Sequence, residues 1–447
     1  MYLDEAFALV PQALPGDFEQ FRRHLSREWI DEALAVTGTA TIRRRRLPAE
    51  HVVWLLIGMA LLRNESIERV AFMLGVALPV ESGLSVVKSA LPQARARLGA
   101  EPLEHLFSAT GEAWGRKSAD AHRYRGLAVY AVDGTTMRVP DMPENWRAFG
   151  GNEGNGVRAG SAYPTVRVLG LMVARSHLLA AMRIGAYEVG EVTLARELWA
   201  DLPRDSLTLI DRNFLVAADL NRLCADGTNR HFLTRAKSTT RLKVIEQLGK
   251  DDDLVEVELS AQTRQKNPGL PERWVARAIA YQRKGFRPAV LLTSLTDAVK
   301  YPRAELVGLY HERWEIELGY DEIKTHLLAR EEAIRSRTPM GVRQELWAIA
   351  LAYNLVRLEM ERAAAEAGVA PTRISFVNAL SFIRQAWLIW SMVPLAPARI
   401  PAALIDLRKT LRMLLLPERR PERTYPRVVK IKMSAYDKKW VTRPKRK

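Results

Sequence analysis

The chain has 447 residues, 48% of them hydrophobic and 26% charged, which is enough apolar material to bury more than one globular core. Its 67 Lys and Arg residues exceed its 51 Asp and Glu residues, and the formal charge of +16 favours a polyanionic partner such as nucleic acid or an anionic membrane. The longest apolar run, residues 51–62, is about half of what a bilayer crossing needs, so no membrane span is indicated.

Two features bear on the cellular compartment. The N-terminus carries an acidic pair, Asp4 and Glu5, where a secretory signal would carry positive charge. The only cysteine, Cys224, cannot form an intrachain disulfide. We therefore expect a protein of the reducing cytoplasm, associated with the nucleoid if its partner is DNA.

Residues 1–120 are expected to form a helical N-terminal domain that binds DNA. Apolar residues recur at helical spacing over four segments: 18–35, 51–62, 67–74 and 86–98. The last segment carries Arg95 and Arg97 near its end, which suits a helix-turn-helix reader as well as a plain helical bundle with solvated arginines. A run of four arginines, Arg43, Arg44, Arg45 and Arg46, is a candidate phosphate contact, with a solvated loop as the alternative.

The texture of the sequence changes near residue 126. Short β-prone runs are separated by turn residues over 127–132, 165–173, 178–184 and 207–210. Helical segments are predicted over 191–199 and 216–225. The resulting order of strand, strand, strand, helix, strand, helix is typical of an α/β domain, which we assign to residues 121–335.

A β insertion is predicted inside this domain, over about residues 230–295. Its strand-like runs fall at 254–259, 274–281 and 289–293. Helices are predicted beyond it at 303–327, 341–365, 374–390 and 402–416, so that residues 336–416 form a helical C-terminal region. The tail, 417–447, holds twelve Lys or Arg residues and three acids, and it is either a DNA arm or a solubilising extension.

Two aspartates follow apolar runs directly and are candidate metal ligands. Asp133 comes after the run 127–132, and Asp211 comes after the run 207–210. We expect both at strand ends, where ligands bind in open α/β sheets, and hard divalent cations take oxygen ligands from several chain segments. Because an aspartate before a glycine is commonly a turn former, Asp133 alone is a weak signal and the pair is a moderate one.

A third acid belongs to a charged helix. If the helix advances 100° per residue, Tyr310, Arg313, Glu317 and Lys324 share one face. Glu317 would then point at the metal site, Arg313 and Lys324 would bind DNA phosphates, and Tyr310 would hydrogen-bond within the same site. An ordinary charged helix is the alternative, and Asp321, one turn later, is the alternative acid.

These motifs resemble those of the insertion element 4 family of bacterial DDE transposases. The family hallmark is Tyr, two residues, Arg, three residues, Glu, six residues, Lys, and Tyr310 to Lys324 fit it without a gap. The Asp-Gly-Thr stretch at Asp133 and the Asp-Arg-Asn-Phe stretch at Asp211 are similar to its other two motifs. The resemblance covers about residues 50–400 and implies an α/β, ribonuclease-H-like core interrupted by a β insertion.

The resemblance also implies an activity. Asp133, Asp211 and Glu317 would be both the catalytic and the metal-binding residues, and they would hold Mg²⁺, with Mn²⁺ as a substitute. The enzyme would bind the inverted repeats at the ends of an element in double-stranded DNA, cleave them and join them to target DNA, as a homodimer on paired ends and without a membrane partner. A nuclease that lacks strand transfer and a non-catalytic DNA-binding protein derived from a transposase are the alternatives.

One position departs from the family pattern. Members that form hairpins are expected to stack a flipped base on a tryptophan in the β insertion, where Ala289 stands in this chain. Phe286 and Trp274 are the candidate substitutes.

Overall fold

A computed structural model gives the architecture, and it describes residues 24–40, 47–74, 89–152, 163–225, 227–271, 273–283, 287–329, 333–392 and 400–417. The arginine run 43–46, Phe286 and all of the basic tail after Pro417 lie outside these ranges. Within them, no helix is both long enough and apolar enough to cross a bilayer.

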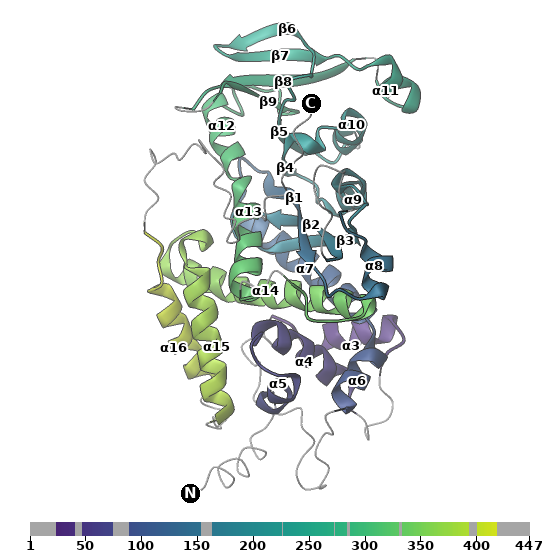
Figure 1. Ribbon diagram of the computed structural model, residues 1–447. Helices are drawn as coiled ribbons and strands as arrows, with labels where there is room; N and C mark the ends of the chain where they lie inside the picture. The colour runs from purple at the N-terminus through teal and green to yellow at the C-terminus, as the bar shows by residue number, and fades with distance from the viewer. Residues whose placement is uncertain are drawn as a thin grey trace, which may run out of the picture.

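A single nine-stranded sheet runs through the molecule in the order β3-β2-β1-β4-β5-β9-β8-β7-β6 (Figure 1). Its strands are β1 (Ala128–Arg138), β2 (Thr165–Val173), β3 (Leu179–Ala186), β4 (Ser206–Ile210), β5 (Arg230–Arg235), β6 (Leu242–Gly249), β7 (Asp252–Val257), β8 (Trp274–Tyr281) and β9 (Ala289–Thr293). Strands β1, β4 and β5 are parallel to one another, and the other neighbours are antiparallel. The predicted α/β class is confirmed, and so are the helices predicted after β3 and after β4, but the helix Pro143–Phe149 between β1 and β2 was not predicted.

The strands of the predicted insertion extend the sheet of the core, because β9 pairs with β5. The prediction located β8 and β9 at their observed bounds and β7 within a few residues, but it missed β5 and β6. Strand β6 lies at the edge of the sheet and exposes Val244 and Ile245 side by side. It therefore shows no clean alternation of polar and apolar residues, which is the signal that predicts a half-buried strand.

The remaining elements are mostly α-helices. They are α3 (Arg27–Val36), α4 (Ala49–Leu61), α5 (Ile67–Met73), α6 (Ala90–Leu98), α7 (Glu101–Ala121), α8 (Pro143–Phe149), α9 (Glu191–Leu198), α10 (Ala217–Ala225), α11 (Ala261–Lys266), α12 (Arg303–His311), α13 (Trp314–Asp321), α14 (Pro339–Ala367), α15 (Phe376–Met392) and α16 (Ile400–Arg412). Short 3₁₀ helices are η3 (Trp199–Asp201), η4 (Arg212–Phe214) and η6 (Pro371–Arg373), and η5 (Glu322–Leu327) is a π-helix.

The alternation of β1 decides which side chains face which helices. Val129 and Ala131 belong to the apolar cluster that also contains the buried residues of α13 and α14, whereas Tyr130 and Val132 belong to the cluster shared with α9 and α10. Since successive side chains of a strand point to opposite faces, Asp133 has the parity of Ala131 and lies on the α13 side of the sheet.

Helix α14 joins the N-terminal helices to the rest of the molecule, and it runs between them and the sheet in Figure 1. Arg63, which is buried, forms an ion pair with Glu345 of α14. Arg95 donates to Gln344 at 3.0 Å and to Ser336 at 3.1 Å. The N-terminal helices are therefore fixed to α14 by directional polar contacts as well as by apolar packing.

Candidate active site

Asp133 and Asp211 lie next to each other at the end of the parallel β1–β4 ladder. The last pair of that ladder is Val132 and Ile210, so each aspartate is the next residue on its strand. Strand β4 ends there because Asp211 caps η4, and its carboxylate accepts from the backbone N–H of Arg212 at 2.5 Å. The prediction that these two aspartates lie side by side on neighbouring strands is confirmed.

The prediction that Asp133 ends its strand is wrong. Strand β1 continues to Arg138 and remains paired with β2 beyond the aspartate, with Asp133 opposite Gly170. The long antiparallel partner supports the Asp-Gly-Thr stretch as strand, whereas the glycine had suggested a turn. Asp133 is at an end only with respect to its shorter parallel neighbour, β4.

Arg313 brings the third acid to the first. Its guanidinium donates to Glu317 Oε1 at 2.8 Å, and it lies 3.5 Å from Asp133 Oδ2. Only 7% of Arg313 is exposed, so this cation is built into the site. Asp321, the alternative acid, is exposed and accepts from Thr325 of the next turn, which leaves Glu317 as the acid that faces Asp133.

The prediction of one continuous α-helix over 303–327 is wrong. Helix α12 ends at His311, α13 begins at Trp314, and the chain passes directly from α13 into the π-helix η5. A π turn contains more residues than an α turn, so the orientation of Lys324 relative to Glu317 is not given by steps of 100°. The break and the change of pitch depend on tertiary contacts, which spacing alone does not reveal.

Glycines allow α13 to approach the sheet closely. The Tyr320 hydroxyl donates to the backbone carbonyl of Asp133 at 2.7 Å. A Cβ on Gly170 would lie only 2.7 Å from this hydroxyl, so a side chain at position 170 would collide with it. On the helix, a Cβ on Gly319 would collide with Met172 and would lie 3.1 Å from the Tyr353 hydroxyl. This approach sets the depth at which Glu317 meets Asp133.

Asp133 is a desolvated acid in a site that holds other carboxylates. Burial raises the pKa of Asp133 to about 6, against the N–H of Gly134 and the charge of Arg313, while Glu317 and Glu191 add to the rise. A desolvated carboxylate beside other acids is stabilised by a divalent cation. Among the residues that the structure describes, however, no three Asp, Glu, His or Cys side chains form a ready metal-binding group. The guanidinium of Arg313 stands between two of the acids.

Sequence reasoning missed Glu191, the first residue of α9. Its carboxylate accepts from Arg167 at 2.8 Å and from Asn213 at 3.2 Å, and a Cβ on Gly134 would lie 2.7 Å from it. The glycine of the Asp-Gly-Thr stretch is therefore needed for close approach. The signal available was an acid at the start of a predicted helix between the two aspartate motifs.

Tyr310 and the basic residues border the acids on the side of α12. Tyr310 is buried, and burial raises its pKa to about 12, with the charge of Asp211 adding to the rise and Arg313 and Arg235 opposing it. Arg235, the last residue of β5, is a second cation that sequence reasoning missed. Lys324 is half-buried in η5.

The other predicted contact residues differ in accessibility. Arg95 is held by α14 as described above, and burial lowers its pKa, whereas Arg97 is exposed. Trp274 is only 6% exposed and packs on Phe232, so it does not present a free ring for a base. By contrast, Trp314 beside the site is 51% exposed, and Arg313 stacks 5.5 Å from its ring centre.

Comparison with known proteins gives the class of this site. The family model described as "Transposase DDE domain" matches residues 124–355, a span that holds all three acids and their scaffold. The chain is thus a DDE transposase enzyme. A second family model, "Insertion element 4 transposase N-terminal", matches residues 15–108.

Two curated relatives from Escherichia coli K12 are similar along much of their length. The transposase InsG for insertion sequence element IS4 is 37% identical over 433 residues, which cover 96% of each chain. A transposase named InsZ is 35% identical over 237 residues, 53% of this chain and 77% of that one. The chain belongs to the insertion element 4 transposase family. A solved piggyBac transposase synaptic complex with hairpin DNA covers 90% of this chain and 86% of that one, with a TM-score of 0.44 and 12% identity.

Proposed function

We propose that this transposase binds the terminal inverted repeats of an insertion sequence and catalyses Mg²⁺-dependent DNA cleavage and strand transfer. The observation that carries the proposal is the bridge of Arg313 between Asp133 and Glu317, formed directly beside Asp211 at the end of the β1–β4 ladder. Acids from three distant segments, linked by a buried cation, are suited to phosphoryl chemistry on a polyanion.

The proposal includes a domain plan. Residues 121–335 form a ribonuclease-H-like core, which is supported by three antiparallel strands followed by the parallel strands β4 and β5. Residues 1–120 form the helical DNA-binding domain, residues 336–416 the helical C-terminal region, and residues 417–447 a basic arm.

The acids suit a pair of Mg²⁺ ions, with Mn²⁺ as a substitute, held by Asp133, Asp211 and Glu317. The fit rests on oxygen-only donors and on the uncompensated negative charge that contributes to the raised pKa of Asp133. Such ions supply a stronger nucleophile and stabilise the charge that develops on the leaving oxygen. The chain's own contribution is to keep two acids at adjacent strand positions and to bring the third acid to them on α13.

Each of the neighbouring residues then has a role towards DNA. Arg313 balances Asp133 and Glu317, and we expect it to bind a DNA phosphate together with Lys324 and Arg235. Trp314 offers an exposed ring beside the acids on which a nucleotide base can stack.

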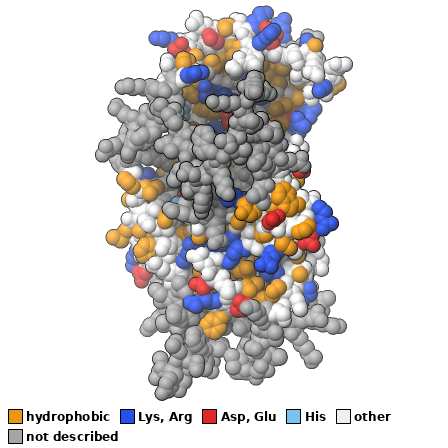
Figure 2. All heavy atoms as spheres, viewed as in Figure 1, with side chains coloured by type: hydrophobic (Ala, Val, Ile, Leu, Met, Phe, Trp, Pro, Cys, Tyr) orange, Lys and Arg blue, Asp and Glu red, His pale blue; other side chains and the backbone are white. Residues whose placement is uncertain are grey.

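Outside the site, Arg97 and the run Arg43 to Arg46 remain candidate phosphate contacts, whereas Arg95 acts within the fold. Figure 2 shows further Lys and Arg side chains at the end of the molecule that carries β6 to β9. Double-stranded DNA is therefore the proposed partner, both as element ends and as target. Because two ends are joined in one event, we expect a homodimer on paired ends.

The test uses duplex DNA that carries the sequences flanking the gene, incubated with the full chain and Mg²⁺. We expect nicked and then joined products, and their loss in Asp133→Ala and Glu317→Ala. Cleaved but never joined DNA would indicate a nuclease without strand transfer, and tight binding without any cleavage would indicate a non-catalytic DNA-binding protein. Full activity of either variant would refute the assignment of the acids.

A further inference from the structure

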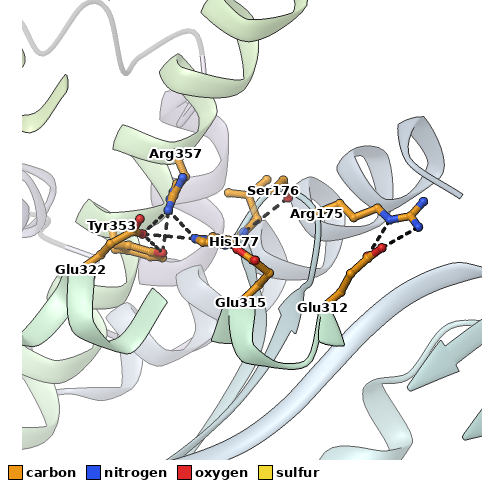
Figure 3. Close-up of polar contacts among 9 residues, drawn as sticks. Arg175, Ser176, His177, Glu312, Glu315, Glu322, Tyr353 and Arg357 are labelled. Atoms are coloured by element: carbon orange, nitrogen blue, oxygen red, sulfur yellow. Dashed lines mark hydrogen bonds and ion pairs between the residues drawn. The ribbon is translucent and has the colours of Figure 1, made fainter. Parts of the chain in front are cut away.

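A second group of charged residues lies on the other side of the helix that carries Glu317. We call it the rear clamp, and it consists of His177, Glu315, Glu322, Tyr353 and Arg357 (Figure 3). Glu315 belongs to α13, Glu322 begins η5, His177 lies in the turn between β2 and β3, and the other two come from α14. The β2–β3 turn and α14 thus meet α13 and η5 on the side of the helix away from Glu317.

The polar contacts of the rear clamp connect its other members to the two acids. Arg357 donates to Glu322 and lies within hydrogen-bond distance of His177 Nδ1. His177 Nδ1 is 3.4 Å from Glu322 Oε2, and His177 Nε2 is 2.8 Å from Glu315 Oε2. The Tyr353 hydroxyl donates to Glu322 at 2.7 Å. His177 therefore connects the β2–β3 turn to both acids.

The turn itself is held in an unusual backbone conformation. His177 has a φ of +63°, which is uncommon for a residue with a side chain, and its N–H donates to Val173 at 2.9 Å. The same turn makes a second contact just before α13, where Arg175 forms a two-pronged ion pair with Glu312 at 2.8 and 3.0 Å (Figure 3). Such a conformation persists where the surroundings over-determine it.

The clamped acids bracket Glu317 along the helix. Glu315 is two residues earlier and so points about 200° away from it, and Glu322 follows at the point where α13 gives way to the π-helix. The π-helical pattern is explicit in the bond from the N–H of Leu328 to the carbonyl of Ile323 at 2.9 Å. The rear contacts therefore fix both the rotation of α13 and the start of the π turn that carries Lys324.

Stability alone does not explain an ion-pair network at this place. A buried ion pair can often be replaced by apolar residues of the same volume at no loss of stability, because desolvation offsets the attraction between the charges. An ion pair differs from apolar packing in that it accepts only one geometry. Since a misplacement of about 1 Å at an active site can cost about 10²-fold in rate, geometry is what this helix requires.

We propose that the rear clamp positions Glu317 and Lys324 for catalysis by locking the rotation of α13 and the pitch of η5. His177, Glu322 and Arg357 are positioning residues in this account, since none of them touches the reacting atoms. The inference rests on the proposed function for its kinetic consequence, but its structural content can be measured without any DNA.

Helix α14 and its neighbours offer a matched control. Glu359, two residues after Arg357, is also a fully buried carboxylate held by one histidine and one arginine, His24 at 2.8 Å and Arg408 at 3.0 Å. Among the described residues, the polar partners of the Glu359 side chain are His24 and Arg408, and neither belongs to α13 or η5. Glu322→Gln and Glu359→Gln therefore remove the same charge from similar environments, and only the first disturbs the rear clamp.

The kinetic test compares end-DNA cleavage by the two variants. We expect Glu322→Gln to lower kcat by about 10- to 100-fold with KM changed by less than about threefold, and Glu359→Gln to leave kcat within about threefold although its melting temperature falls. Tyr353→Phe, which removes only one contact to Glu322, gives a smaller loss of kcat and serves if Glu322→Gln does not fold. Wild-type kcat in the clamp variants, or parallel losses in Glu359→Gln, would overturn the proposal.

The structural test is amide hydrogen exchange of the full chain without DNA. We expect faster exchange over residues 314–327 in Glu322→Gln and an unchanged rate there in Glu359→Gln. Equal exchange in the two variants would overturn the clamp even if cleavage were observed. If instead the wild-type chain failed to cleave end DNA while the exchange difference appeared, the proposed function would fail and the clamp would stand.

Discussion

The two faces of the helix that carries Glu317 differ in how their charges are balanced. On the front, burial raises the pKa of Asp133 to about 6, and one arginine, Arg313, is shared between Asp133 and Glu317. On the rear, burial would raise the pKa of Glu322, but Arg357, His177 and Tyr353 hold it down to about 2. A carboxylate of β1 on the front side of α13 thus stays desolvated with a raised pKa, whereas a carboxylate on the rear side is compensated by its partners.

This contrast separates what the fold uses from what the reaction uses. A compensated acid adds to the stability of the native state, while an under-compensated one costs stability and persists where function requires it. Neutralising an acid of the front face should therefore lower activity with little effect on stability. Removing Arg357 or Glu322 from the rear face should lower stability.

The largest effect is expected from neutralising the front acids. Asp133→Asn and Glu317→Gln should lower the rate of end cleavage by at least about 10³-fold, because each removes a proposed metal ligand. The melting temperature of Asp133→Asn should be unchanged or higher, since the charged form of this carboxyl is desolvated. Asp321→Asn is the matched control on the same helix, and we expect it to retain the wild-type rate within about threefold. If Asp133→Asn lowered the stability as much as Arg357→Met does, the proposed difference between the front and rear faces would be contradicted.

Removing the rear cation should have the largest effect on stability. Arg357→Met leaves Glu322 buried without its principal partner, and we expect the free energy of unfolding to fall by about 3–5 kcal/mol. Chemical denaturation with a linear extrapolation measures it, and a double variant Arg357→Met/Glu322→Leu should recover most of the loss. If the single variant were as stable as the wild type, the rear face would not be compensated in the way described.

The two faces should also respond to pH with opposite signs. Because the pKa of Asp133 is raised, its carboxyl holds a proton up to about pH 6, and the apparent affinity for Mn²⁺ should fall by about tenfold per pH unit below that value. Its own contribution to stability is present at low pH and is lost as the pH rises through about 6. The contribution of Glu322 is present above its ordinary pKa and is lost as the pH falls towards 2.

Calorimetric titration of Mn²⁺ between pH 5 and 7 measures the front face. The slope with pH should be reduced in Asp133→Asn, whereas Glu359→Gln should retain it. An affinity that is independent of pH in the wild type would show that Asp133 does not take part in metal binding.

Most of the site was predictable because its parts are local. Asp133 and Asp211 each follow an apolar run, and the parallel pairing that ends at Val132 and Ile210 brings the next residue of each chain segment side by side, whatever the rest of the fold is. Glu317 was found through its spacing to Tyr310 and Arg313, which lie within seven residues of it. The two aspartates were predicted from the length of the apolar runs before them, and the glutamate from residues within two turns of the same helical segment.

The rest depended on contacts between distant segments. The bridge of Arg313 to Asp133 spans 180 positions, and the partners of Glu322 come from the β2–β3 turn and from α14. The π-helix could not be read from spacing, because its pitch is set where Glu322 is anchored. For the same reason spacing did not reveal that Arg95 is held by Gln344, which is 249 residues away in the sequence.

The smallest effect tests the link between the two faces. Tyr320 of α13 is buried, and its hydroxyl donates to the backbone carbonyl of Asp133. The substitution Tyr320→Phe removes this hydrogen bond and keeps the ring. We expect a loss of about 1 kcal/mol in the free energy of unfolding and a fall of a few-fold in kcat, since the carbonyl loses this donor and α13 loses one tie to β1. Tyr301→Phe, at a buried tyrosine just before α12, is the control for removing a buried hydroxyl outside the site. A kcat equal to that of the wild type, together with the expected loss of stability, would mean that the rear clamp positions the helix without help from this bond.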